Sequence, residues 1–136
     1  MAELIVRADL SALATIADFL TEALAGCGDD LIFAIQLAVD EACSNTILYG
    51  FPDGEPGTIT VTCTADADAV RVTIADDGVP FDPLTAPSPL LDIPAEERPI
   101  GGLGVHFIRT VTDSVTYTRE GGKNVLSMEK KRPASS

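Results

Sequence analysis

Three groups of residues have types and spacings that could do chemistry. Glu41 and Asn45 are four residues apart, so on a helix they would project from one side, one turn apart. Asp76 and Gly78 follow an apolar run, where a carboxylate could accept a hydrogen bond from a ligand amine and a glycine lets the backbone approach closely. The third group could expose successive N–H groups to an anion at a helix start, and it reads Gly101-Gly102-Leu103-Gly104.

Each group also has an ordinary structural interpretation. Glu41 and Asn45 could be a solvated pair on a helix surface, although an Asn within an apolar helix calls for a hydrogen-bond partner or a metal. Asp77-Gly78 could be a plain turn, and so could the glycine-rich run. That run is no Walker loop, because no Gly-Lys-Ser/Thr follows it, and no strand leads into it as a dinucleotide-binding unit requires.

Hydrophobic spacing predicts the elements that must position these groups. Leu4 and Val6 indicate a short strand, after which Asp9 or Ser11 can cap a helix. Apolar residues at helical spacing define that helix, at Leu13, Ile16, Phe19, Leu20 and Leu24. A second helix is predicted from Asp30 to about Tyr49, with one buried face formed by Leu31, Ala34, Ile35, Ala38, Ala42 and Thr46.

The second half of the chain predicts strands, a long loop and one more helix. Alternating residues indicate strands at 58–64 and 70–75, joined as a hairpin, and a closing hairpin at 115–118 and 125–128. Six prolines between Pro80 and Pro99 predict an extended surface loop, and a helix should follow from the glycine run to about Thr112. The expected fold is an α+β two-layer sandwich, with three helices on one face of a mixed or antiparallel sheet.

Length and composition limit the class of protein. With 136 residues, 46% of them apolar, the chain should form one domain over residues 1–131 and a disordered tail at 132–136. No stretch approaches the roughly 18 consecutive apolar residues of a membrane helix, so we expect a cytoplasmic protein without a membrane partner. Cys27, Cys43 and Cys63 fit neither a disulfide framework nor a zinc site, and we interpret them as reduced packing residues.

The charge excludes one class of partner. The formal net charge is −12, with only nine Lys and Arg residues. Since affinity for nucleic acid is built largely from clustered cations, we expect no direct nucleic-acid binding. A nucleotide site in such an acidic chain would have to hold phosphates with backbone N–H groups and a divalent cation rather than with a basic patch.

In their order along the chain, the three groups resemble the ATP-binding motifs of the GHKL superfamily. LAVDEACSN resembles its N box, ADDGVPFDP its first glycine box and GGLGVHFIRTVTDSVTY its second, and GGKNVLSMEKK matches its closing hairpin. The short N-terminal strand and helix, the DDGVPFDP segment and the compact lid resemble the anti-sigma-factor serine kinases. One departure is Pro80, which stands where many members have the second glycine of the first box.

This resemblance implies a role for each motif. Asp76 would take the adenine amino group of ATP, and Gly78 would shape the base pocket. Asn45 would coordinate a Mg²⁺ ion that bridges the triphosphate, and Glu41 would help to activate the incoming serine hydroxyl. Gly102 and Gly104 would contact the phosphates, within a nucleotide-binding segment that comprises Gly101, Gly102, Leu103, Gly104 and Val105. Residues 82–100 would form the lid over the nucleotide, and His106 would be a neighbour of the site or a packing residue, not a phosphoacceptor.

The resulting hypothesis is an anti-sigma factor with protein serine kinase activity. Its substrate would be a STAS-type anti-anti-sigma protein, it would sequester a sigma factor, and it would act as a homodimer, as related kinases do. The second hypothesis is a nucleotide-gated binding module without kinase activity. The catalytic domain of a histidine kinase would need dimerisation helices and a phosphoacceptor histidine, and a chaperone or topoisomerase type ATPase would need further domains. A purely structural domain would explain each motif singly but not their order.

Overall fold

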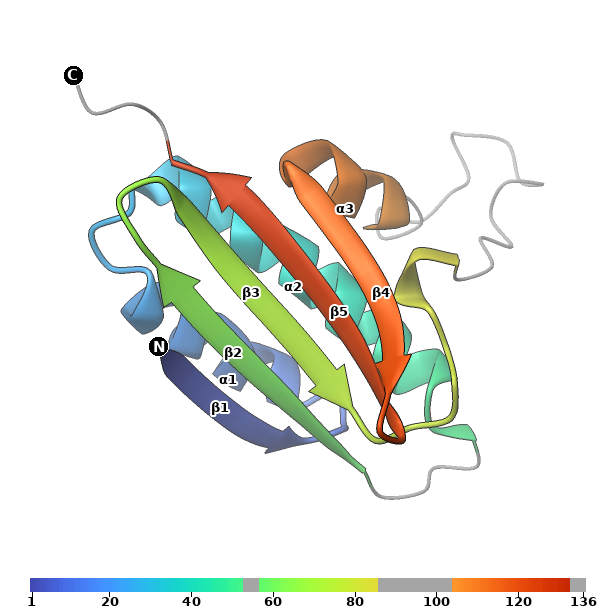
Figure 1. The fold of residues 1–136 in the computed structure, drawn as a ribbon. Coiled ribbons are helices and arrows are strands. Elements are labelled where there is room, and N and C mark those ends of the chain that lie inside the picture. Colours follow the sequence, from blue (N-terminus) through green and yellow to red (C-terminus); the bar gives the residue numbers. More distant parts are fainter. Residues whose placement is uncertain (53–56, 86–103, 133–136) are drawn as a thin grey trace, which may run out of the picture.

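The structure, a computed structural model, describes residues 1–52, 57–85 and 104–132. Five strands and three α-helices make up most of this part of the chain (Figure 1). In chain order the elements are β1 (Ala2–Arg7), α1 (Ala12–Ala23), α2 (Asp29–Tyr49), β2 (Thr58–Ala65), β3 (Ala69–Asp76), the 3-10 helix η2 (Pro83–Thr85), α3 (Gly104–Val111), β4 (Ser114–Glu120) and β5 (Lys123–Lys131).

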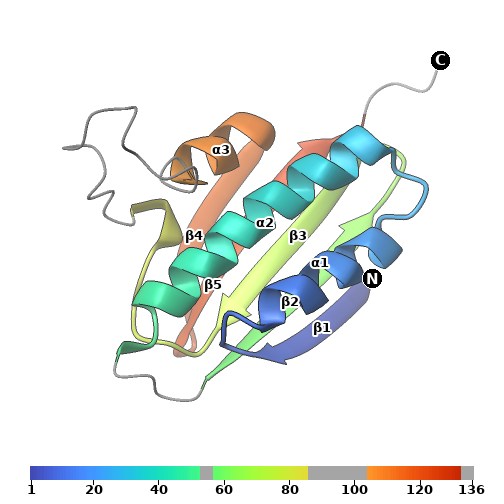
Figure 2. The same ribbon diagram turned by 180° about the vertical axis from the view of Figure 1, so that it is seen from behind.

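The strands form one sheet with the order β1-β2-β3-β5-β4. Every neighbouring pair is antiparallel, so the sheet is antiparallel rather than mixed. Figure 2 shows all three α-helices on the same side of this sheet, with α2 running diagonally between α1 and α3. The predicted α+β two-layer sandwich is therefore confirmed.

The core lies between the sheet and the helices. Side chains alternate across a strand, so every second residue of β2, β3 and β5 is buried against the helical layer. The helices complete the core with apolar residues three or four positions apart. The core includes Ile59, Val61, Val72, Ile74 and Leu126 of the strands and Ile16, Leu20, Leu31, Ile35 and Val39 of the helices.

Helix α2 has the length and composition of a membrane span, with 21 residues and few charges. In the structure, however, one of its faces is buried in the core, including Leu31, Ile35 and Ala42. A core helix passes the same test of length and hydropathy as a membrane span does. The apolar character of α2 is therefore accounted for by its packing on the sheet.

Two local predictions differ from the structure. Ser11 precedes α1 as its N-cap residue, but its side chain makes no capping hydrogen bond, and Asp9 instead accepts a hydrogen bond from the Ser11 backbone N–H at 2.7 Å. These two short polar side chains close a turn before the helix, which is a common alternative to capping. In the proline-rich stretch, η2 interrupts the predicted loop, and residues 86–103 lie outside the described residues.

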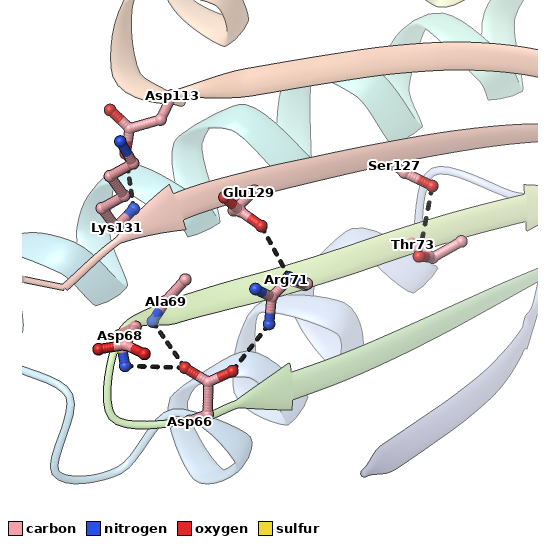
Figure 3. A network of polar contacts seen from close by, with 9 residues as sticks. All are labelled: Asp66, Asp68, Ala69, Arg71, Thr73, Asp113, Ser127, Glu129 and Lys131. Atoms are coloured by element: carbon pink, nitrogen blue, oxygen red, sulfur yellow. Dashed lines mark hydrogen bonds and ion pairs between the residues drawn. The ribbon is translucent and has the colours of Figure 1, made fainter.

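The face of the sheet opposite the helices is polar. Figure 3 shows Arg71 of β3 between Asp66 and Glu129, with N–O distances of 2.8 and 2.7 Å. The Arg71 hydrogen bond lowers the pKa of Asp66 to about 2, helped by backbone N–H groups of the β2–β3 turn. Because these side chains are about half exposed, such ion pairs contribute little to stability.

The three cysteines are buried and free, as the sequence predicted. Cys43 of α2 is fully buried, and burial raises the pKa of its thiol to about 12. Only the thiolate reacts readily with alkylating agents. We therefore expect Cys43 to resist iodoacetamide at pH 8 in the native protein and to react once the protein is denatured, which mass spectrometry would show. Rapid labelling of native Cys43 would contradict its place in the core.

Candidate functional site

Asp76 is an acidic residue at an inward-facing position. It ends β3 two residues after Ile74, so the alternation of the strand turns its side chain towards the helices, and it is only 3% exposed. Its Oδ1 atom accepts hydrogen bonds from Asn124 Nδ2 and from the Gly78 backbone N–H, both at 2.9 Å. The carboxylate is thus held firmly on one side.

The other oxygen of Asp76, Oδ2, has no hydrogen bond within the described residues. No side-chain N or O atom in that part of the chain is both fully buried and without a partner, so Oδ2 retains access to solvent. Burial raises the pKa of Asp76, which the hydrogen bonds from Asn124 and Gly78 partly offset. The charge of Asp77 raises the same pKa further, and that of Arg119 lowers it. Asp76 therefore offers one accessible acceptor in a largely desolvated position.

Gly78 allows the turn after β3 to touch the end of α2. A Cβ atom at this position would lie 2.4 Å from the carbonyl oxygen of Gly50 and 3.0 Å from Asp76 Oδ1. Gly50 is the C-cap residue of α2, and its carbonyl accepts a hydrogen bond from the Val79 N–H at 2.9 Å. Only a residue without a side chain fits between these backbone groups.

The candidate site residues Glu41 and Asn45 lie on the flank of α2 that faces away from α1. Gln36 marks the α1 side, because its Nε2 donates to the Ala17 carbonyl at 3.0 Å. Asn45 lies nine residues later, about two and a half turns at about 3.6 residues per turn, and is therefore on the opposite flank. One turn further, the Tyr49 ring contacts the Phe81 ring, with centroids 5.6 Å apart. Asn45 therefore lies on the side of α2 that meets the segment between β3 and η2.

Glu41 lies one turn before Asn45 on this flank and is half buried. Burial raises the pKa of Glu41, and the negative charge of Asp40 raises it further. A carboxylate with a raised pKa is a stronger base once it is ionised. Helix α2 as a whole contacts both η2 and α3.

Three of the four residues of the glycine run lie outside the described residues. These are Gly101, Gly102 and Leu103. Within the described residues, Gly104 is the first residue of α3 and Val105 the second. The predicted lid also falls mostly outside, apart from η2, where Asp82 Oδ1 accepts a hydrogen bond from the Leu84 N–H at 2.8 Å. The described residues contain no cluster of three or more His, Cys, Asp or Glu side chains that could hold a metal ion by themselves.

Asn124 is a central site residue that the sequence analysis missed. It is 2% exposed, lies opposite Asp76 in the β3–β5 register and donates to it. Its position in β5 alternates with the buried Leu126 and Met128, so an inward-facing amide was the available signal. The sequence analysis gave Asn124 no role in the site, because Asp76, Val79 and Phe81, to which it is bonded, lie 48, 45 and 43 positions away.

The sequence matches the model of the histidine kinase-like ATPase domain over residues 6–130. The fold is similar to the histidine kinase domain of a blue-light-activated histidine kinase from Erythrobacter litoralis, with a TM-score of 0.52. That match has 19% sequence identity and covers 89% of this chain and 59% of the other. The likeness of the two structures concerns the fold alone.

Among curated relatives, the serine/threonine-protein kinase BtrW of Bordetella bronchiseptica is 33% identical over 72% of this chain and 69% of its own length. The serine-protein kinase RsbW of Listeria monocytogenes is 34% identical over 88% of this chain and 74% of its own. RsbW of Bacillus mycoides is 29% identical, and the match spans 59% of that protein. The family model and these relatives confirm the resemblance seen in the motifs, and the chain belongs to the histidine kinase-like ATPase domain family.

Proposed function

We propose that this chain is an anti-sigma factor with protein serine kinase activity that uses Mg-ATP. The observation that carries the proposal is the buried Asp76 carboxylate, with one oxygen held by the protein and the other free to accept a hydrogen bond. Kinase activity is supported by relatives that are named serine or serine/threonine kinases. A cytoplasmic location fits this role.

The adenine base would bind at the turn after β3. Asp76 Oδ2 would be the acceptor for the 6-amino group, and Gly78 would shape the base pocket by letting the turn pack against the backbone of Gly50. A hydrogen bond to an ionised group contributes about 1.5–3 kcal/mol, which is enough to select a base that offers a donor at this position. Nearby, Tyr49 and Phe81 supply an aromatic boundary on the α2 side.

The phosphates would lie between α2 and α3. The amide oxygen of Asn45 suits Mg²⁺, which prefers oxygen ligands and completes its coordination shell with phosphate oxygens and water. Few protein ligands are needed in that arrangement, which fits the absence of an acidic cluster among the described residues. The backbone N–H groups of the nucleotide-binding segment 101–105 would hold the phosphates at the start of α3.

Glu41 would accept the proton of the attacking serine hydroxyl. It lies one turn from Asn45 on the same flank of α2, so it would be adjacent to a metal-bound phosphate. Bound Mg-ATP would supply the phosphoryl group. In phosphoryl transfer the protein contributes mainly by positioning the reactants and by stabilising charge in the transition state. The two α2 residues would therefore have different roles, with Asn45 coordinating the metal and Glu41 acting as the general base.

The proposed protein partners are a STAS-type anti-anti-sigma protein, as the phosphorylated substrate, and a sigma factor, as the protein that is sequestered. A homodimer is the proposed assembly. We expect no direct nucleic-acid partner, since the net charge of −12 would repel a phosphate backbone. In this scheme transcription is controlled through protein contacts alone.

Transfer of labelled phosphate from Mg-ATP to proteins in an extract of the source organism tests this proposal. We expect one small labelled protein, which mass spectrometry would identify together with its modified serine. ATP binding by the purified domain without any labelled protein would favour the nucleotide-gated module. Failure to bind ATP at all would overturn both.

Gly78→Ala should weaken both ATP binding and the fold. The added Cβ would meet the backbone of Gly50, which cannot rotate away as a side chain could, so the turn must shift and the Val79 hydrogen bond must lengthen. We expect the free energy of unfolding to fall by about 1–3 kcal/mol. Chemical denaturation and calorimetric titration with Mg-ATP would measure the two effects.

Gly26→Ala is the matched control for that variant. Gly26 has a φ angle of 90° in the α1–α2 connection, and a Cβ there would contact nothing within 4 Å. Its replacement should reduce stability by roughly 1 kcal/mol through backbone strain and leave ATP affinity unchanged. Equal losses of ATP affinity in both variants would contradict a local role for Gly78.

A further inference from the structure

We propose that Asn124 is the positioning residue that makes this site select a 6-aminopurine, by fixing which oxygen of Asp76 faces the base. The inference rests on the proposed function, since it assigns the Asp76 turn to the base of the nucleotide. The side chain of Asn124 bonds to Asp76 and to the turn after β3, so its effect would be on base selectivity rather than on transfer.

The Asn124 amide is saturated with hydrogen bonds. Its Nδ2 group donates to Asp76 Oδ1 at 2.9 Å and to the Val79 carbonyl at 2.8 Å. Its Oδ1 atom accepts from the Phe81 N–H at 3.1 Å and from the Tyr117 hydroxyl at 2.5 Å. Both donors and both acceptor positions of the side chain are therefore in use.

This pattern fixes the orientation of the amide. A rotation by half a turn would place the carbonyl oxygen against Asp76 and the Val79 carbonyl, and the NH₂ group against the Phe81 N–H. Each of these contacts would be repulsive, and the Asn124 side chain is buried, where an unpaired polar group is costly. Asn124 therefore always presents a donor to Asp76.

That fixed donor has a consequence for the base. The Asn124 amide and the Gly78 N–H both donate to Oδ1 of Asp76, and these hydrogen bonds favour the ionised carboxyl group. The accessible oxygen, Oδ2, therefore acts only as an acceptor. A 6-amino group can donate to it, whereas a 6-oxo group would face it with a second acceptor. The selectivity thus comes from the charge state and orientation of Asp76, which Asn124 sets.

The same amide ties base recognition to the segment between β3 and η2. Val79 and Phe81 are both bonded to it, and Arg119 of β4 donates to the Gly78 carbonyl at 2.9 Å. The backbone around the base is therefore held by side chains of the closing hairpin. A change at Asn124 should alter the contacts to the base and leave Glu41 and Asn45 of α2 in place, where the transfer chemistry is proposed to occur.

Asn124→Asp is the most informative variant, because it keeps the shape of the side chain. At pH 8 both carboxyl groups should be ionised, so the new side chain cannot donate to Asp76, and at lower pH the two groups should take up a shared proton and titrate as a pair. The charged or titratable groups around the pair are Asp77, Arg119 and Tyr117, with Cys43 of α2 behind it, and this variant leaves all of them in place.

The readout is the ratio of the dissociation constants for inosine triphosphate and ATP, measured by calorimetry. Inosine triphosphate carries a 6-oxo group and an identical triphosphate. We expect this ratio to fall about tenfold in Asn124→Asp at pH 8, which corresponds to one charge-assisted hydrogen bond. It should recover as the pH is lowered and the new carboxyl regains a proton to donate. An unchanged ratio in a folded variant would overturn the inference.

Two controls separate positioning from structure. Tyr117→Phe removes only a donor to Asn124 Oδ1 and should keep the selectivity. Thr112→Val removes the buried hydroxyl that bonds to the Ile108 carbonyl, and it should reduce stability without changing the ratio. A loss of selectivity in Thr112→Val equal to that in Asn124→Asp would show a general effect of destabilisation and overturn the inference.

A measurement on the wild-type protein covers the case in which the Asn124 variants do not fold. The side-chain amide protons of Asn124 should exchange slowly with solvent in NMR spectra and shift when Mg-ATP binds, but not when tripolyphosphate binds. Rapid exchange of these protons would overturn the inference. Wild-type protein that binds neither nucleotide would overturn the proposed function itself, which is a distinct result.

Discussion

Glu41→Gln is expected to bind Mg-ATP as the wild-type protein does and to transfer phosphate roughly 10²- to 10⁴-fold more slowly, the usual contribution of a general base. The substitution keeps the shape of the side chain and removes only its basicity. Since Glu41 is half buried on the flank of α2 that carries Asn45, its loss should leave the adenine site at Asp76 untouched.

Two assays and one control measure this effect. Calorimetry gives the affinity for Mg-ATP, and labelled phosphate gives the rate of transfer to the protein substrate. Glu22→Gln makes the same chemical change at an exposed position of α1 and should behave as wild type in both assays. A wild-type transfer rate in Glu41→Gln would remove Glu41 from the mechanism, whereas a loss of ATP affinity would mean that it helps to hold the nucleotide.

The pH dependence of transfer provides an independent check on this role. A base must be ionised, so the rate should fall as the pH drops through the pKa of Glu41, which burial and the charge of Asp40 hold above its usual value. Asp40→Asn removes the neighbouring charge and should lower that pKa. Its transfer rate should therefore persist to lower pH than that of the wild-type protein.

The sequence predicted the order and type of the elements because each has a strong local signal. Apolar residues alternate along 58–64 and 70–75 and recur at helical spacing along α2. These patterns show which face of each segment is buried, and the period of the buried positions distinguishes a strand from a helix. The bounds of α2 were close, since it starts at Asp29 rather than Asp30, whereas β5 spans Lys123–Lys131 rather than the predicted 125–128. Sequence could not settle whether the sheet was mixed, because strand order depends on pairings between distant segments such as β3 and β5.

The site was only partly predictable for a related reason. Asp76 and Gly78 stand together in the sequence, and the structure shows them bonded to each other. Their other contacts, to Gly50 at the end of α2 and to Asn124 in β5, arise only when the sheet and helix are assembled. The roles of Glu41 and Asn45 stay predictions, since they depend on a bound nucleotide, and Gly101, Gly102 and Leu103 lie outside the described residues.

Asp76→Asn is expected to lose ATP affinity by about 10- to 100-fold, the equivalent of about 1.5–3 kcal/mol for a hydrogen bond to a charged group. The amide can still accept from Asn124 and Gly78 through its oxygen, so the turn should keep its structure. Its NH₂ group would then face the 6-amino group of adenine, donor against donor. Calorimetric titration with Mg-ATP would measure the loss.

The same variant should be at least as stable as the wild-type protein at neutral pH. Burial raises the folded-state pKa of Asp76, so its ionisation disfavours the folded state, and the stability it contributes at low pH is lost as the pH rises through that pKa. An asparagine has no such ionisation. The stability difference between variant and wild type should therefore shrink as the pH is lowered, which urea titrations at several pH values would show.

Asp77→Asn is the matched control for this pair of effects. Asp77 points to β2, where its carboxylate accepts from the Thr58 N–H at 2.8 Å and from the Thr58 hydroxyl at 3.2 Å. We expect this variant to bind ATP normally, so that Mg-ATP still raises its melting temperature, as binding to the folded state alone requires. At the same Mg-ATP concentration, the melting temperature of Asp76→Asn should rise less than that of the wild-type protein, because its affinity is lower. If both variants bound ATP equally well, neither carboxylate would be the adenine acceptor, and the base would have to lie away from the end of β3.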